Sequence, residues 1–229
     1  MSRAALLALA LALVVRSNRA SELISWDAVM ESYEHVRDYT ALYEKEERAI
    51  ANGERQRIRL SFRKPLDVRL EWLSDEGAVD QVAVYRAGLN DGKVVARRSG
   101  VLGRLAGTIR VDPRDRLALQ DSRHPITEVG LGHIIDQVAH DLRSGVIRAD
   151  PAVAEIVDGR PGYRFDFGAV STAGALGIDG ARRAHIWVDR ELKLPVKVEV
   201  RGSSDALLER HRFTELRLNV GLTDRTFSL

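Results

Sequence analysis

RIRLSFRKPLDVRLEW, residues 57–72, decides the fold of this 229-residue chain. Apolar and polar residues alternate strictly on both sides of Lys64-Pro65-Leu66. A period of two places successive side chains on opposite faces of a β-strand. Proline fixes its own backbone and cannot donate to a strand ladder, so it marks a turn. The stretch therefore predicts two antiparallel strands with one apolar face and one face of paired charges.

The same alternation continues along the chain. Val82 and Val84 are predicted to extend the apolar face, and Asn90-Asp91-Gly92 is typical of a hairpin turn. The pattern predicts about ten strands in one antiparallel series. The later strands are expected at residues 154–157, 163–167, 184–188, 196–200 and 206–218.

Two helices are predicted beside this sheet. Before the first strand, apolar residues recur at intervals of three and four, with Ser21 or Ser25 as the N-cap. The second helix is expected between Thr127, as its cap, and Gly145, as its stop. The stripe of the first helix consists of Leu23, Trp26, Val29, Met30, Tyr33 and Val36, and that of the second of Leu131, Ile134, Ile135, Val138 and Leu142.

The N-terminus has the features of an export signal. Residues 4–15 form a continuous apolar run after Arg3, too short to span a bilayer comfortably but typical of a signal peptide. Residues 1–20 are therefore predicted to be a signal peptide, and residues 21–229 a single domain. The expected location is the periplasm or the exterior; the alternative is an uncleaved leader that anchors the protein in the inner membrane.

Composition excludes several classes of function. The chain carries 35 Lys and Arg against 33 Asp and Glu, so it lacks the basic surplus of a nucleic-acid-binding protein. It contains no cysteine, which excludes disulfides, cysteine-ligated zinc and thiol catalysis. No cofactor is predicted.

Enzyme motifs are also missing from the sequence. It has no Gly-x-Ser-x-Gly, no His-Glu-x-x-His and no phosphate-binding loop. Gly130-Leu131-Gly132 lacks the third glycine of a dinucleotide fingerprint and is better explained as the start of a helix. The chain is thus predicted not to be an enzyme, with a histidine-dependent hydrolase as a distant alternative.

Two polar groups remain candidates. His133, Asp136 and His140 share one side of the second predicted helix, where a metal site is conceivable but a solvent-exposed face is the preferred interpretation. Arg123 and His124 precede Pro125, and this pair is a candidate for binding an anionic head group. The charged run at residues 44–48 is interpreted as a solvated strand or as protection of a strand edge.

Several segments resemble known families. Residues 184–229 resemble the end of the LolA/LolB-like superfamily of periplasmic lipoprotein carriers. Residues 25–48, 58–73 and 121–134 resemble an uncharacterised family of exported bacterial proteins within that superfamily. The resemblance implies an α+β fold: a single, strongly curved antiparallel sheet, or half-barrel, with helices across its concave side. It implies no catalytic residue, and members of the superfamily act as carriers, acceptors and envelope sensors.

A curved sheet covered by helices can hold an apolar ligand. The first hypothesis is therefore a non-catalytic binding protein for a lipid or for the acyl chain of a lipoprotein. The second is an envelope interaction or sensor module that has a packed core and binds another envelope protein. The residues predicted to line a ligand cavity are Trp26, Met30, Tyr33, Leu60, Phe62, Leu70, Trp72, Val82 and Val84.

Overall fold

The computed structural model describes residues 24–48, 55–100, 107–171 and 174–229. The predicted signal peptide lies outside these residues. The described strands form one 12-stranded antiparallel sheet in the order β6-β5-β4-β3-β2-β1-β12-β11-β10-β9-β7, with β8 on β9. The strands are β1 (Asp38–Glu47), β2 (Gln56–Arg63), β3 (Asp67–Leu73), β4 (Val79–Arg86), β5 (Val94–Arg98), β6 (Ile109–Val111), β7 (Ile147–Ala149), β8 (Val153–Val157), β9 (Arg160–Ala169), β10 (Arg183–Asp189), β11 (Pro195–Arg201) and β12 (Leu207–Leu218).

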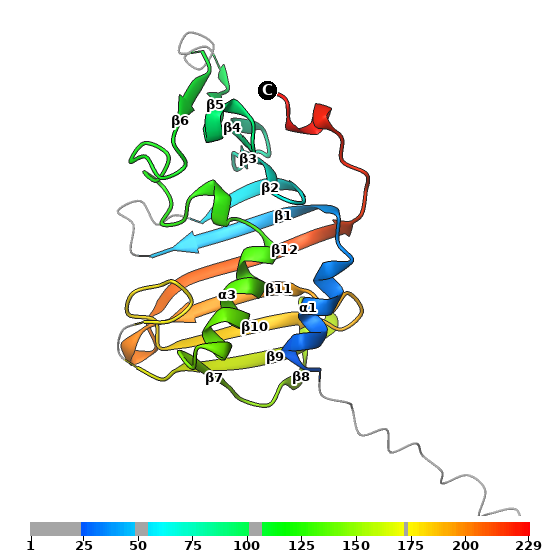
Figure 1. Ribbon diagram of the computed structural model, residues 1–229, viewed down its shortest axis with the longest axis vertical. Helices are drawn as coiled ribbons and strands as arrows, with labels where there is room; N and C mark the ends of the chain where they lie inside the picture. Colours follow the sequence, from blue (N-terminus) through cyan, green and yellow to red (C-terminus); the bar gives the residue numbers. More distant parts are fainter. Residues whose placement is uncertain (1–23, 49–54, 101–106, 172–173) are drawn as a thin grey trace, which may run out of the picture.

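The sheet is open and bent, which confirms the predicted half-barrel. Strands β1 and β9–β12 run broadside across the view, while β3–β6 curl above them (Figure 1). Two helices lie on one face, across β9–β12 (Figure 1). They are α1 (Trp26–Glu34) and α3 (Leu131–Arg143), and short 3-10 turns occur at η1 (Asn90–Gly92), η2 (Ile126–Glu128), η3 (Ser203–Asp205) and η4 (Asp224–Phe227). No helix in the described ranges has the length and apolar character needed to cross a membrane.

The strand pair predicted from residues 57–72 is confirmed as β2 and β3. Leu60 pairs with Leu70 on the concave face, where both are buried. On the other face an Arg59 nitrogen lies 2.7 Å from a Glu71 oxygen, as the predicted charge pairing requires. The sequence indicates about ten strands, whereas the described sheet has 12. The difference arises because β6 and β7 have three residues each, too few to show an alternation.

The predicted helices are present, with one corrected boundary. Ser25 caps α1 by accepting a hydrogen bond from the amide of Ala28. Thr127, predicted to cap the second helix, lies instead in η2, and Gly130 is the N-cap of α3. Gly145 follows the end of α3 as predicted, with φ of 69°.

Two tyrosine hydroxyls lie against the first turn of α3, one from the sheet (Tyr39 of β1) and one from α1 (Tyr33). The amide of Leu131 donates a hydrogen bond of 2.9 Å to the hydroxyl of Tyr39, a buried residue of β1. A Cβ on Gly130 would lie 2.5 Å from that hydroxyl, and a Cβ on Gly132 would lie 2.5 Å from the hydroxyl of Tyr33. The Gly130-Leu131-Gly132 sequence is therefore the start of a helix. Its two glycines leave room for two tyrosine hydroxyls beside the backbone.

One predicted cavity strand has its faces reversed. Leu70 pairs with Ala83, so Ala83 shares the concave face, whereas Val84 pairs with Arg69 on the opposite face. Val82 and Val84 form a separate apolar cluster with Phe227 of η4. The prediction that they extend the apolar face of β2 and β3 is wrong, because Phe227 of the C-terminal segment covers Val82 and Val84 on the convex side, so apolar residues occupy both faces of β4 at this point.

The convex face carries a ladder of ion pairs. Glu199 of β11 is only 6% exposed and lies 3.0 Å from Lys197, 2.7 Å from Arg201 and 3.1 Å from Arg210. Burial by itself raises the pKa of Glu199, but hydrogen bonds from Arg201 and Lys197 outweigh it and lower the pKa to about 2.

We predict that Gly130→Ala destabilises the fold by about 3 kcal/mol, because the new methyl group meets the Tyr39 hydroxyl and Gly130 has φ of 115°. Gly145→Ala is the control, since Gly145 also has positive φ but has open space around it, and it should cost about 1 kcal/mol. Urea unfolding measures both. Equal losses would show that backbone strain alone, and not contact with Tyr39, makes glycine necessary at Gly130.

We also predict that Glu199 makes stability fall in acid. A carboxylate with a depressed pKa stabilises the fold above its unfolded pKa of 4.5, and this contribution disappears as the pH falls toward 2. The free energy of unfolding of Glu199→Gln should therefore fall less between about pH 5 and pH 2 than that of the parent. Identical slopes would contradict the assignment.

Candidate functional site

A cavity of about 1360 Å³ lies between the concave face, α3 and the chain that joins β6 to α3. We call the part of that chain at residues 112–130 the cover segment. The volume exceeds that of ordinary small-molecule pockets, which hold roughly 300–1,000 Å³. Apolar residues of the wall come from both halves of the sheet, from α3 and from the cover segment; they include Ile58, Leu70, Trp72, Ala83, Val94, Ala96, Leu117, Ile126, Ile134, Val138, Ile186, Val198 and Phe213.

Polar contacts hold the cover segment on the edge of the cavity. The amide of Arg123 donates a hydrogen bond of 2.9 Å to the Glu47 carboxylate. The carbonyl of Asp121 accepts hydrogen bonds from Lys45 and Gln56, at 3.4 and 3.3 Å. The segment thus rests on the ends of β1 and β2 through polar groups, and Ile126 adds a buried apolar contact with the core.

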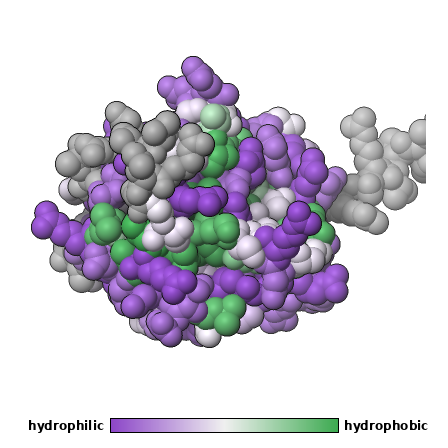
Figure 2. All heavy atoms as spheres, turned by 90° about the horizontal axis from the view of Figure 1, so that it is seen from above, coloured by the Kyte–Doolittle hydropathy of each residue, from purple (hydrophilic) through white to green (hydrophobic). Residues whose placement is uncertain are grey.

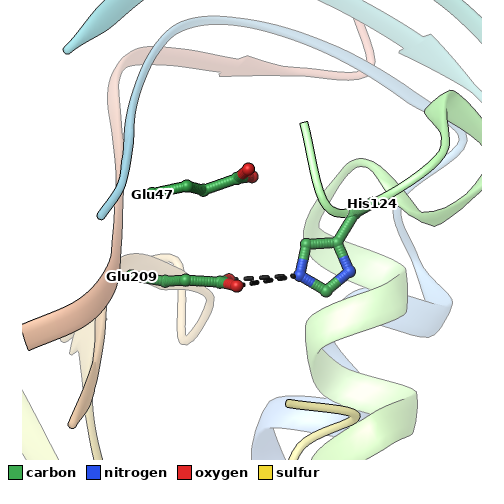
Figure 3. Close-up of side chains that lie close together, drawn as sticks. All are labelled: Glu47, His124 and Glu209. Atoms are coloured by element: carbon green, nitrogen blue, oxygen red, sulfur yellow. Dashed lines mark hydrogen bonds and ion pairs between the residues drawn. The ribbon is translucent and has the colours of Figure 1, made fainter. Parts of the chain in front are cut away.

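A cluster of charged side chains lines the cavity at the end of β1, where Glu47 is the last residue of the strand. Glu47 of β1 and Glu209 of β12 face His124 of the cover segment (Figure 3). His124 Nε2 lies 3.1 Å from Glu209 Oε2, and His211 Nε2 lies 3.1 Å from the same oxygen. The guanidinium of Arg123 stands 3.7 Å from the carboxylate of Glu209.

Hydrogen bonds between the acidic and basic members of the cluster favour their charged forms. Burial by itself raises the pKa of Glu209, but hydrogen bonds from His124 and His211 hold it well below its ordinary value. The hydrogen bond to Glu209 raises the pKa of His124 despite burial. Burial lowers the pKa of Lys45 and of His133, another histidine of the cavity wall. Glu209 has no exposed surface, so it needs these partners to remain ionised.

The predicted cavity residues fall into three groups. Leu70, Trp72 and His124 line the cavity. Leu60 and Phe62 are buried on the concave face but do not line it; Phe62 stacks on Tyr39 at 5.1 Å between ring centres. Arg123 pairs with Glu209 instead of lining the cavity, and Val82 and Val84 lie on the convex side.

The residues predicted to form a lid pack against α3 and β9. Trp26 donates a hydrogen bond of 3.3 Å to the carbonyl of Ile135 and meets Phe165 and Phe167 edge to face. Met30 and Tyr33 pack against the same core. None of the three lines the cavity, whose helical wall is formed by residues of α3.

The metal site considered on the second helix is not assembled among the described residues. His133 lines the cavity, whereas Asp136 and His140 are exposed. Lys45 and Glu47, interpreted from sequence as solvated, are buried instead, because β1 is a central strand with alternate residues facing inward. The sequence did indicate this burial, because the odd-numbered positions of β1 form one face of the strand. That face carries Tyr39, Tyr43, Lys45 and Glu47.

Comparisons with known proteins agree with the fold. A family described as "Protein of unknown function (DUF1571)" matches residues 36–229. A chain of the Pseudomonas aeruginosa MucA/MucB complex is similar at 18% identity and a TM-score of 0.50, over 89% of this chain and 59% of that one. An uncharacterized conserved protein from Thermus thermophilus is similar at 9% identity and a TM-score of 0.50, over 88% and 91% of the two chains.

A LolA superfamily protein from Nitrosomonas europaea matches 90% of this chain with 98% of its own, at 10% identity and a TM-score of 0.34. The match to the crystal structure of MucB covers 61% of the MucB chain, so this chain spans less than two thirds of that protein's length. No curated protein matches the sequence. The predicted membership of an uncharacterised family is confirmed, and the likenesses to solved structures describe the fold alone.

We predict that His124→Ala loosens the cover segment. The change removes one donor from a buried carboxylate and should cost about 1–3 kcal/mol in the free energy of unfolding. Amide hydrogen exchange at residues 121–130 should accelerate more than exchange in α3. His140→Ala, an exposed histidine of α3, is the matched control and should change neither quantity. Unaltered exchange in His124→Ala would show that the cluster does not hold the segment.

Proposed function

The chain belongs to the DUF1571 family of proteins of unknown function, and we propose that it is a non-catalytic binding protein that holds an acyl chain in its cavity. The ligand is a lipid or the acyl chain of a lipoprotein. Given the predicted export signal, the expected location of this activity is the periplasm. The observation that carries the proposal is the cavity of about 1360 Å³ between the concave face, α3 and the cover segment.

The wall of the cavity suits a long, flexible, apolar ligand. Its apolar residues extend from Val94 and Ala96 on β5 to Ile186 on β10, so the hollow follows the sheet across many strands. Burial of each CH₂ group contributes roughly 0.8 kcal/mol, so a long acyl chain can bind tightly through burial alone. Hydrophobic residues also reach the surface in the middle of the upper side of the molecule, among hydrophilic ones (Figure 2).

The cover segment offers a route for entry and release. It is fixed by hydrogen bonds and ion pairs at Asp121, Arg123 and His124, and has only a short 3-10 turn. Segments with few buried apolar contacts open locally at low cost in free energy. A carrier needs such a segment, because its ligand must leave as well as enter.

A protein partner is the alternative function. β8 pairs only with β9, which leaves its other edge free among the described strands. Val153 and Ile156 of this strand are 47% and 64% exposed. An exposed apolar edge strand can pair with a strand of another protein. The MucA/MucB complex shows that a protein with a related fold binds another protein.

We predict that filling the cavity weakens acyl binding. Ala83→Phe and Ala96→Phe place rings on the apolar wall, and either should raise the dissociation constant of a fluorescent palmitate analogue about tenfold or more. Ala154→Phe adds the same ring to exposed β8 and should leave binding unchanged. Circular dichroism checks that each variant is folded.

The opposite pattern would contradict the proposal. Saturable binding of the probe that is lost in Ala154→Phe and kept in both cavity variants would assign the apolar ligand to the β8 edge. Absence of saturable binding by the parent protein would favour the protein-interaction alternative.

A further inference from the structure

The charged end of the cavity brings together the donor atoms of a metal site. Ligand atoms of Glu47, His124 and Glu209 all lie within 4.8 Å of one another. His211 adds a second imidazole nitrogen, 3.1 Å from Glu209 Oε2. Two ligand atoms bound to one zinc ion at about 2.0–2.2 Å in tetrahedral geometry are separated by roughly 3.3 Å. The observed spacings around Glu209 are close to that value.

The far side of each imidazole is also held. His211 Nδ1 lies 2.8 Å from the hydroxyl of Tyr43, and His124 Nδ1 lies 3.4 Å from a Glu128 oxygen. Histidines that ligate metals usually donate their second ring N–H to a carboxylate or another oxygen, which fixes the tautomer. Both histidines can therefore present an Nε2 lone pair toward Glu209 while Nδ1–H donates outward.

We propose that Glu47, His124, Glu209 and His211 form a binding site for a divalent transition-metal cation of the zinc class. Nitrogen and carboxylate oxygen donors favour zinc and its neighbours over calcium or magnesium, which prefer oxygen donors alone. When the cation binds, each Nε2 gives its lone pair to the metal and any proton on Nε2 leaves to solvent. Apart from that N–H bond, no covalent bond of the protein is broken.

Two cations of the protein face the same carboxylates. Lys45 Nζ is 3.2 Å from Glu47 and also donates to the carbonyl of Asp121. Arg123 stands 3.7 Å from Glu209 and, unlike the two imidazoles, makes no short contact with it. Their charges lower the affinity for a metal compared with a site formed only by acids and histidines. The site is therefore expected to exchange its ion readily.

The position of the site gives the ion a structural effect. His124 belongs to the cover segment, whereas Glu47, Glu209 and His211 belong to β1 and β12. A bound ion would fasten the cover segment to the sheet at one end of the cavity. Metal binding does not require an acyl ligand, so this inference can fail or hold independently of the proposed function.

The test is a titration of the full, metal-free protein with Zn²⁺ by calorimetry at neutral pH, repeated with Co²⁺ to obtain its visible spectrum. We expect saturable binding of one equivalent per chain, with an ion that exchanges readily, and tetrahedral Co²⁺ bands. His124→Ala and His211→Ala should each weaken binding at least tenfold. The control His35→Ala/His140→Ala removes two exposed histidines and should leave binding unchanged.

Thermal unfolding keeps the test decisive if a variant is less stable. Zn²⁺ should raise the Tm of the parent and of the control, but not that of Glu209→Gln or His124→Ala. Absence of stoichiometric binding, or binding that survives in both histidine variants, would overturn the proposal. The cluster would then be an ion-pair latch whose positive charge is a proton on His124.

Discussion

The close seat of α3 on the sheet is the constraint on which the rest of the structure depends. Gly130 and Gly132 let the hydroxyls of Tyr39 and Tyr33 approach the backbone of the first turn, and Tyr39 accepts the hydrogen bond of Leu131. α1 and α3 cover β9–β12, and among the described residues the cover segment, together with α3, faces the bent part of the sheet from β1 to β5 (Figure 1). The cavity lies between this segment, α3 and the concave face of the sheet.

The two parts of the cover are held by different forces. α3 is fixed by buried apolar residues and aromatic contacts, which give a rigid element. The cover segment is fixed to β1 and β12 by the cluster of Glu47, His124 and Glu209, whose strength depends on protons, salt and any bound cation. The attachment of the cover segment, unlike that of α3, therefore depends on solution conditions.

The strand pattern could be predicted from sequence wherever one face of a strand is wet. Residues 57–72 show a strict alternation because their charged face lies in solvent as paired Arg and acidic residues. Val82-Ala83-Val84 shows none, because both faces of β4 are buried, one by the cavity wall and the other by η4. Val82 and Val84 were therefore predicted to line the cavity, although Ala83 is the residue of this stretch that does so.

Of the charged cluster, Arg123 and His124 were identified from sequence as a candidate site, but the carboxylates were not, because they come from strands that meet only after folding. Glu47 and Glu209 are paired across β1 and β12, and His124 arrives from a segment without a period. The alternation along β1 indicated that Lys45 and Glu47 share a face with the buried tyrosines. Buried charges are rare without a partner, however, and the partners of these two residues are distant in sequence.

The most direct test of the account is to ask what the cavity holds. Residues 21–229, exported to a bacterial periplasm and purified without detergent, would be denatured, extracted with organic solvent and analysed by mass spectrometry. The account predicts a stoichiometric acyl lipid or acylated peptide. A folded protein that yields no lipid and also fails to take up an added acyl probe would contradict it.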